Sequence, residues 1–468
     1  MKSIAGFRKY ENLILWLMIV GFGIAYVSLC FNDNIWTDEG FTIDLLRNCD
    51  TYAQVCSFTA ADVHPPLYYL ILKVFTDLFG IKLLLIKLLS IVPMLLTMML
   101  APLVMNKEFG FRVALFFILI LGTLPCTMEY AVQARMYTWA LFFVTLCGLF
   151  AFRAASSDHA VNWISYLIGG VGAAYTHYFA FVAVLWIYGF LFLYLIFWRR
   201  KGVLRWLVTS VASLLAYLPW LSQMAVQVKG VSGSYWIAAI DGKVLRSYFP
   251  WIVKTDLPYV TAVFCVIFLI AFVLLGYQLV HRKKLDGSLT VALFGVVIPL
   301  LVVVTGVVLS KLIRPIFIIR YIMPSIGLLS LFLAISFSFL ETKAWISMGL
   351  FWLGVGTVDY GTNYKAEYLA TYTEQTMEFL EEHLGENDLV VYNYYGYDFI
   401  YEYYVDREYL VYIGDVDLGG SFDTIWFLDT PLNQEFTADQ LASYGLISTE
   451  MGQYGIEQNE FKIYQISR

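Results

Sequence analysis

The stretch LLLIKLLSIVPMLLTMMLAPLVM at 83–105 decides the fold, because its 23 residues carry a single charge, Lys87. A helix that crosses the hydrocarbon layer needs about 20 mostly apolar residues, and this stretch has that length. The whole chain has the same character: of its 468 residues, 60% are hydrophobic and 14% are charged, with a mean hydropathy of +0.70. Soluble globular chains carry about 25% charge. The composition therefore excludes a cytosolic enzyme, a disordered regulator and a disulfide-rich secreted module.

Eleven stretches in all have the character of a membrane-spanning helix. They lie at 12–31, 83–105, 112–128, 137–153, 161–176, 178–198, 203–221, 259–280, 289–309, 316–339 and 344–360. With this count all the basic loops fall on one side; they contain Lys2, Arg8, Lys9, Lys107, Arg112, Arg153, Arg199, Arg200, Lys201, Arg205, Arg282, Lys283, Lys284 and Lys343. Lys and Arg collect in cytoplasmic loops, so we expect a multi-pass protein with a cytoplasmic N-terminus.

The stretch 65–80 (PPLYYLILKVFTDLFG) is apolar but short, and Lys73 and Asp77 interrupt it. If it crossed the membrane, the later basic loops would lie outside, against the positive-inside rule. We therefore expect a helix that lies in the outer interface. The first apolar stretch leads into a polytopic chain, so we expect a retained span rather than a cleaved signal peptide.

The tail differs in composition from the rest of the chain. Residues 361–468 hold 20 acidic and 4 basic residues, a balance of −16, whereas the preceding 360 residues have a balance of +10. The helix-like stretches are 366–384, 396–404 and 435–444, and the strand-like runs are 389–393, 409–413, 424–428 and 461–466. Their alternation predicts a small soluble α/β domain.

These features divide the chain into two predicted domains. The first, 1–360, spans the membrane and includes the outer loop 32–82; the second, 361–468, is acidic and extracytoplasmic. No basic tract is typical of a nucleic-acid arm, so membrane lipids are expected as partners and nucleic acid is not. Cys49 and Cys56 share the outer loop, where an oxidising exterior would permit a disulfide; two thiols are the alternative.

Polar side chains gather at the predicted outer ends of the spans. They are Asp38, Glu39, Asp62, His64, Lys87, Glu129, Gln133, Arg135, Tyr137, His177, Tyr178, Arg314, Arg320 and Tyr321. Ionisable groups at membrane depth are costly, and they are usually paired or functional. Acidic and basic groups here converge on one face, which indicates a site at that face.

Sugar transfer from a lipid-phosphate donor would use both kinds of group. Arg and Lys bind a phosphate, and Arg can do so with two parallel hydrogen bonds. A carboxylate can take the proton of an acceptor hydroxyl, and cations can stabilise the departing phosphate. The sequence has no P-loop and no dinucleotide-binding glycine pattern, and none is needed for such a donor. No cofactor is required by this chemistry, although Asp62 and His64 leave a divalent metal open.

Each of these residues also has a structural alternative. Asp38 and Glu39 could belong to a solvated loop, and Asp62 could cap a helix that starts near Pro65 and Pro66. The two histidines, His64 and His177, could serve only as structural hydrogen-bonding groups. The arginines Arg135 and Arg320 could extend toward lipid headgroups.

The motifs resemble those of a known group of enzymes. W-x-D-E at 36–39, DVHPPLYY at 62–69, R-x-Y at 135–137, YTHY at 175–178 and RYIMP at 320–324 occur in the order found in bacterial protein O-mannosyltransferase-like glycosyltransferases of family 39. The resemblance covers about 10–340 and implies the GT-C fold, an extracytoplasmic active site in a bacterial plasma membrane, a polyprenyl-phosphate sugar donor, and inversion at the anomeric carbon.

The resemblance also implies roles for individual residues. Asp38 matches the catalytic base and Glu39 its neighbour, while Asp62 and His64 match the second polar motif. The remaining matches are substrate-binding positions, namely Lys87, Arg135, Tyr137, His177, Arg320 and Tyr321. Relatives usually carry Arg where this chain has Lys87, and Lys keeps the charge but loses the bidentate geometry.

We therefore predict a hexosyltransferase, similar to mannosyltransferases, whose acceptor is a glycan, a glycolipid or a protein hydroxyl. A transporter or lipid flippase is one alternative, although its charges would lie near mid-membrane in matching halves. A non-catalytic scaffold of the cell envelope is the other.

Overall fold

The computed structural model describes residues 2–31, 34–233, 237, 239–281, 287–368, 372–457 and 459–468. The chain packs as two units: Met1–Phe31 with Thr51–Asn363, and Asn32–Asp50 with Tyr364–Arg468. The sequence placed the whole outer loop 32–82 in the membrane domain. In the structure the first part of this loop packs with the tail instead.

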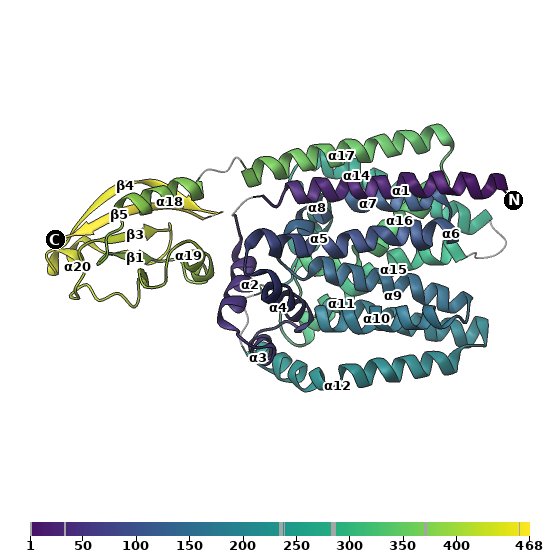
Figure 1. The fold of residues 1–468 in the computed structure, drawn as a ribbon, viewed down its shortest axis with the longest axis horizontal. Coiled ribbons are helices and arrows are strands. Elements are labelled where there is room, and N and C mark those ends of the chain that lie inside the picture. Colours follow the sequence, from purple (N-terminus) through teal and green to yellow (C-terminus); the bar gives the residue numbers. More distant parts are fainter. Residues whose placement is uncertain are drawn as a thin grey trace. The chain divides into compact units, whose positions relative to one another are not determined.

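The first unit is helical, and Figure 1 shows its long helices running along a common direction. Its elements are α1 (Lys2–Ser28), α3 (Tyr52–Ala61), α4 (Leu67–Phe79), α5 (Leu83–Leu100), η1 (Ala101–Met105), α6 (Asn106–Glu108), α7 (Phe111–Thr123), α8 (Pro125–Val132), α9 (Tyr137–Ser156), α10 (Ala160–Thr176), α11 (Tyr178–Tyr194), η2 (Leu195–Arg199), α12 (Val203–Gly233), α13 (Gly242–Val253), α14 (Pro258–His281), α15 (Gly287–Leu312), η3 (Ile319–Ser325), α16 (Ile326–Ser338) and α17 (Thr342–Tyr368).

A helix lies at each of the 11 predicted spans. Among the described residues, eight helices are long and apolar enough to cross a membrane, or nine if the bent pair α7–α8 counts as one span. The other two predicted spans are α10, which has 17 residues, and α17, which has 27. The chain is thus a polytopic helical membrane protein. The basic residues Arg282, Lys283 and Lys284, used to predict its sidedness, lie outside the described residues.

Two local features shape the end of the unit that carries the polar motifs. Helix α4 has only 13 residues, fewer than a span needs, and it is not among the helices that could cross. The predicted span 112–128 is bent by 66° between α7 and α8. Leu124 is extended (ψ 123°) because it precedes Pro125, which disfavours the helical conformation of the residue before it.

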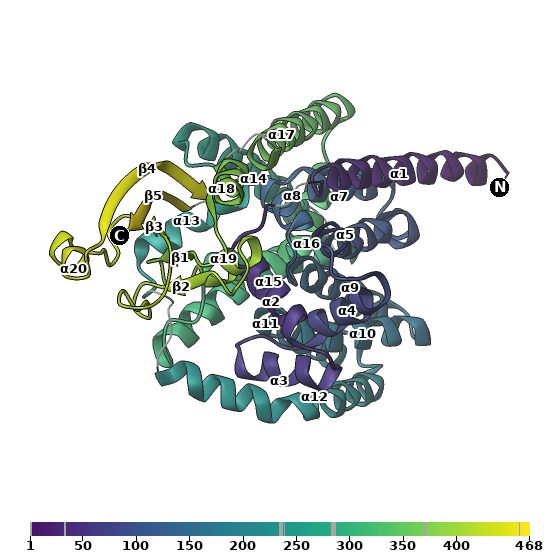
Figure 2. The same ribbon diagram turned by 60° about the vertical axis from the view of Figure 1, so that its left-hand side comes forward.

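The second unit contains α2 (Thr37–Asn48) and the tail (Figure 2). The tail elements are α18 (Tyr372–His383), β1 (Leu389–Tyr392), α19 (Asp398–Tyr404), β2 (Leu410–Tyr412), β3 (Ile425–Asp429), α20 (Ala438–Ser443), β4 (Ile447–Ile456) and β5 (Asn459–Ser467). The strand order is β2-β1-β3-β5-β4. Strand β1 pairs in parallel with β2 and β3, whereas β5 is antiparallel to β3 and β4. The predicted soluble α/β domain is therefore present.

The core of the tail forms on both sides of the central strands. Val390 and Val391 point to opposite faces of β1, and both are fully buried. Ile425 and Phe427 extend this core on β3. A parallel strand with both faces covered reads as a continuous apolar run, which is why LVVY was recognisable as a strand.

Candidate functional site

The DVHPP motif forms a carboxylate–histidine pair in the connection between α3 and α4. Asp62 follows the last residue of α3, and its Oδ2 lies 2.6 Å from Nδ1 of His64. The capping position of α4 is occupied by Pro66, and no side chain caps that helix. The alternative that Asp62 caps α4 is therefore not what the structure shows, and its carboxylate orients His64 instead.

The charge state of Asp62 follows from its neighbours. Burial raises the pKa of the Asp62 carboxyl, but the attraction of His64 and Arg135 and the hydrogen bonds from His64 and the Val63 amide prevail. The pKa of Asp62 is consequently lower than its usual value of 3.8. Asp62 is thus a carboxylate at neutral pH, and it shares an electrostatic environment with Arg135.

Arg135 lies in the turn between α8 and α9, and it is only 3% exposed. Its Nη1 donates to the hydroxyl of Tyr69, 3.2 Å away on α4. Tyr69 is fully buried, and its hydroxyl holds the guanidinium of Arg135 in place. Sequence reasoning did not single out Tyr69, although it ends the DVHPPLYY motif.

His177 occupies the centre of this group. It is the capping residue of α11, and its Nδ1 accepts a hydrogen bond from the Phe179 amide at 3.1 Å. Burial holds the pKa of His177 well below its usual range, and nearby His64, Arg135 and Arg320 lower it further. The ring is therefore neutral, and since Nδ1 is an acceptor, its proton is on Nε2. His177 has the structural role considered above, and it also presents an N–H donor among cations.

Aromatic rings surround His177 on several sides. Its ring centroid lies 6.2 Å from that of His64, 5.7 Å from Tyr137 and 4.9 Å from Tyr321. Tyr321 and Arg320 belong to η3, far along the chain from the other residues. We call Asp62, His64, Arg135, His177 and Arg320 the polar cluster. It unites four of the sequence motifs at one end of the helical unit.

Lys87 is buried on α5, one turn before Ser90. The Ser90 carbonyl accepts a hydrogen bond from Thr138 of α9, 2.8 Å away. Residues three apart share a helix face, so Lys87 lies on the side of α5 that packs on α9. Its binding to a donor phosphate stays a prediction.

Glu129, one of the polar residues at the predicted outer ends of the spans, pairs with a lysine of the α13 segment. It forms an ion pair with Lys254, which ends α13 and lies over the rings of Tyr130 and Trp251. Gln133 donates to Glu129 at 3.3 Å. This arrangement ties the segment around α13 to α8, and it accounts for Glu129 without a catalytic role.

Asp38 and Glu39 lie in the second unit, in the first turn of α2. Glu39 is buried, and its Oε2 accepts a hydrogen bond from the Trp36 amide at 3.1 Å, as in a capping box. Asp38 is the other carboxylate of this turn, where the helix dipole favours negative charge. The structure thus gives Glu39 a structural function. That the two residues share a pocket with the polar cluster stays a prediction.

Metal binding and a disulfide were both left open by the sequence. Among the described residues, no group of three or more His, Cys, Asp or Glu side chains could hold a metal ion, and the Asp62–His64 pair supplies two ligands. Cys49 and Cys56, for which a disulfide was one alternative, are both thiols.

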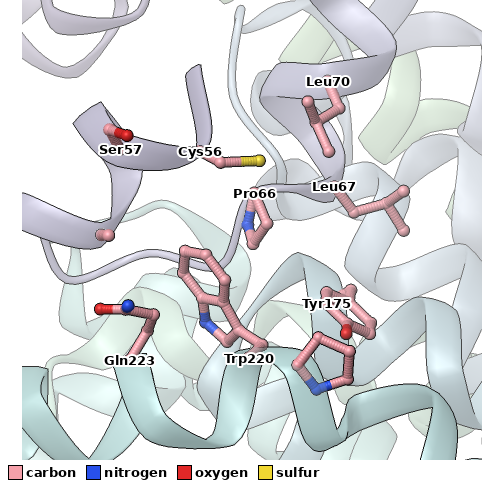
Figure 3. A pocket seen from close by; sticks show the side chains of 10 residues that line it. Cys56, Ser57, Pro66, Leu67, Leu70, Tyr175, Trp220 and Gln223 are labelled. Carbon is pink, nitrogen blue, oxygen red and sulfur yellow. The ribbon is translucent and has the colours of Figure 1, made fainter. Parts of the chain in front are cut away.

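An apolar cavity of about 560 Å³ lies between residues of α3, α4, α10 and α12 (Figure 3). It is lined by Cys56, Ser57, Ala60, Pro66, Leu67, Leu70, Tyr175, Pro219, Trp220 and Gln223. A second cavity of about 380 Å³ lies against α10 and α12 and shares Leu67 with the first. Pro66 follows His64 by two residues, so the first cavity begins beside the cluster.

Two polar residues of the apolar helix α12 connect this cavity to the cluster, and the sequence did not reveal them. Trp220 donates to the hydroxyl of Tyr178, next to His177, at 3.1 Å. Gln227 accepts from that hydroxyl and donates to the Thr59 carbonyl of α3 at 2.8 Å. The only available signal was a glutamine within a largely apolar helix.

The comparisons with known proteins agree with this architecture. No family model and no curated protein matches the sequence. Two solved structures of ArnT from Cupriavidus metallidurans, one bound to undecaprenyl phosphate and one in the apo state, have similar folds, with TM-scores of 0.61 and 0.59. Each is 12% identical to this chain, covers 99% of it and is itself covered over 98% of its length. The expected GT-C fold is thus confirmed over the whole chain, whereas membership of family 39 is not shown.

Proposed function

We propose that this protein is a membrane glycosyltransferase that moves a sugar from a polyprenyl-phosphate donor to a hydroxyl of an extracytoplasmic acceptor. The carrying observation is the polar cluster, in which Arg135 and His177 are buried, beside an apolar cavity. Such a donor has an anionic phosphate and a long hydrocarbon chain, and it needs both environments next to each other. The likeness of the fold to a protein solved with undecaprenyl phosphate supports this class of ligand.

In this proposal the phosphate binds to Arg135 and Arg320, with Lys87 as a further cation. Arg135 is held by Tyr69, so its guanidinium needs little reorganisation on binding. The neutral His177 can donate its Nε2 proton to a phosphate oxygen, and Asp62 keeps His64 oriented toward the donor. The prenyl chain follows the cavities along α4, α10 and α12.

Transfer then takes a single displacement. Asp38 accepts the proton of the acceptor hydroxyl while that oxygen forms a bond to the anomeric carbon, and the bond from this carbon to the phosphate oxygen breaks. The electron pair leaves on the phosphate, where the arginines stabilise the charge. One displacement inverts the configuration at the anomeric carbon. A monophosphate leaving group next to these cations does not require a metal, so we propose that no cofactor takes part.

We place the site on the outer face of a bacterial plasma membrane, with the tail outside and the N-terminus in the cytoplasm. The sugar is a hexose, as expected for a hexosyltransferase similar to mannosyltransferases. The acceptor is a glycan, a glycolipid or a protein hydroxyl.

The test is release of free polyprenyl phosphate by the purified chain in proteoliposomes that contain a polyprenyl-phosphate hexose. We expect turnover that needs an acceptor and persists in a metal chelator. A flippase would move labelled lipid between leaflets without cleaving it, and a scaffold would do neither. Either of these results would contradict the proposal.

A further inference from the structure

Helix α2, which carries Asp38, packs on a helix of the tail more than 350 residues away in sequence. The two helices approach closely at Gly40 of α2, where a Cβ would lie 3.0 Å from the Cβ and the carbonyl oxygen of Phe399 in α19. Next to this point the rings of Phe41 and Phe399 meet edge to face, with their centroids 5.8 Å apart. The contact therefore depends on a residue without a side chain at position 40.

The N-terminal entry of α2 is held by the turn between β4 and β5. Glu457 in this turn accepts a hydrogen bond from the Ile35 amide at 2.8 Å and another from the hydroxyl of Tyr404 in α19. The Glu457 amide in turn donates to Thr373 of α18 at 2.9 Å. Since Ile35 precedes Asp38 by three residues, this carboxylate fixes the chain directly before the proposed base.

The C-terminal half of α2 has its own attachments to the tail. Arg407 lies 2.5 Å from Asp44 of α2 and 2.6 Å from Glu402 of α19. Arg47 donates to the Glu402 carbonyl at 3.2 Å, and its guanidinium lies 5.4 Å from the centroid of the Tyr403 ring. Helix α2 is thus attached to the tail on both sides of Asp38, by the β4–β5 turn before it and by α19 and Arg407 after it.

We infer that the tail positions the catalytic base: Glu457 and Arg407 are positioning residues that set where helix α2 presents Asp38. The inference rests on the proposed function, because it takes Asp38 as the base. The donor-binding groups belong to the helical unit and make no use of these contacts. Loss of the attachments should therefore slow the transfer step and leave donor binding unchanged.

The first test inserts a methyl group between the two helices. In Gly40→Ala we expect kcat to fall about tenfold, the KM for a polyprenyl-phosphate hexose to stay within about twofold, and the amides of α2 to exchange faster with solvent in the full-length protein. The matched control is Gly276→Ala in α14, where a Cβ would meet nothing within 4 Å. This control should leave kcat and the α2 amides as in the wild type.

The second test separates positioning from general destabilisation through charge reversal. Asp44→Arg or Arg407→Asp alone should each lower kcat about fivefold, because each places like charges together. The double variant restores opposite charges, with Glu402 beside the new guanidinium, and should recover most of the wild-type kcat. A structural defect unrelated to this pair would give no such rescue.

The outcomes distinguish this inference from the proposed function. Suppose that the wild type is active. Unchanged kcat and unchanged α2 exchange in Gly40→Ala would then overturn the inference and leave the proposed function in place. The absence of rescue in the double variant would do the same. No turnover by the wild type would overturn both. A parallel rise in KM for the donor would show that the contacts serve binding, which also contradicts the inference.

Discussion

The outer loop 32–82 is continuous in sequence, yet its two parts belong to different packing units. The first part forms α2, whose Asp44 pairs with Arg407 of the tail. The second part carries the Asp62–His64 pair, which lies among buried groups of the helical unit. The difference teaches that two acidic motifs separated by only about twenty residues need not share a role. The Asp62–His64 pair, which shares its surroundings with Arg135, suits donor binding, and the helix attached to the tail suits presentation of a base.

The largest expected effect is a loss of sugar transfer, and it should occur on substitution of Asp38 and not of its neighbour Glu39. Asp38→Asn removes the proton acceptor without changing the shape, so we expect transfer to fall about 1000-fold, within the range of general base catalysis, with donor affinity unchanged. Glu39→Gln keeps an oxygen for the Trp36 amide and should cost only about tenfold through a weaker helix start. Transfer kinetics and donor affinity are measured for both variants. A larger loss of transfer in Glu39→Gln than in Asp38→Asn would make Glu39 the base and Asp38 the structural residue.

In the polar cluster, donor binding is expected to depend most on Arg135. Arg135→Lys keeps the charge but loses the bidentate geometry and the hydrogen bond to Tyr69. We expect kcat/KM for the donor to fall about 100-fold, with a raised KM. Arg112→Lys is the matched control, because Arg112 binds the Leu340 carbonyl at 2.9 Å outside the polar cluster. Equal kinetics for the two variants would remove Arg135 from the site.

Two aspartates lie toward opposite ends of α4, Asp62 before the helix and Asp77 within it, and they should respond differently. Asp62→Asn removes the charge that orients His64, so we expect donor affinity to fall about tenfold. Asp77 lies near the end of α4, where it pairs with Lys73 and accepts from Tyr52, and its side chain is 39% exposed, outside the polar cluster. Asp77→Asn should therefore stay within about twofold of the wild type. A larger loss for Asp77→Asn in titrations with labelled donor would move the site to the other end of α4.

The smallest effect concerns stability and pH. His177 has a lowered pKa in the folded protein, so below about pH 6.5 the unfolded chain binds a proton that the folded one does not. Stability should then fall with decreasing pH, by at most about 1.4 kcal/mol per pH unit from this group. His177→Asn keeps an acceptor for the Phe179 amide and should flatten this dependence. Thermal unfolding in detergent from pH 7.5 to 5 measures it, and identical slopes for both proteins would contradict the burial of a neutral His177.

The spans were predictable because length and apolarity are their only requirements, and a helix lies at each predicted position. The bend before Pro125 was missed, although a proline within an apolar run is its signal in the sequence. Strand β4 was also missed. Its sequence ISTEMGQYGI lies mostly exposed at the edge of the sheet, and it lacks the alternation that marks a half-buried strand.

The candidate site could be predicted residue by residue but not as an arrangement. Asp62, His64 and His177 stood out because polar groups beside apolar spans are costly. The hydrogen bond between Arg135 and Tyr69, and the contact between Gly40 and Phe399, join distant parts of the chain. Such contacts leave no periodic pattern in the sequence, which is why α2 was assigned to the membrane domain.

The central claim is that Asp38 of α2 and the polar cluster, which includes Arg320, act at the same face of the membrane. In a background without native cysteines, Asp38→Cys and Arg320→Cys can each be treated with a small membrane-impermeant thiol reagent, applied from one side of oriented vesicles at a time. The account predicts that both positions react from the outer side only. Reaction of the two positions from opposite sides would contradict it.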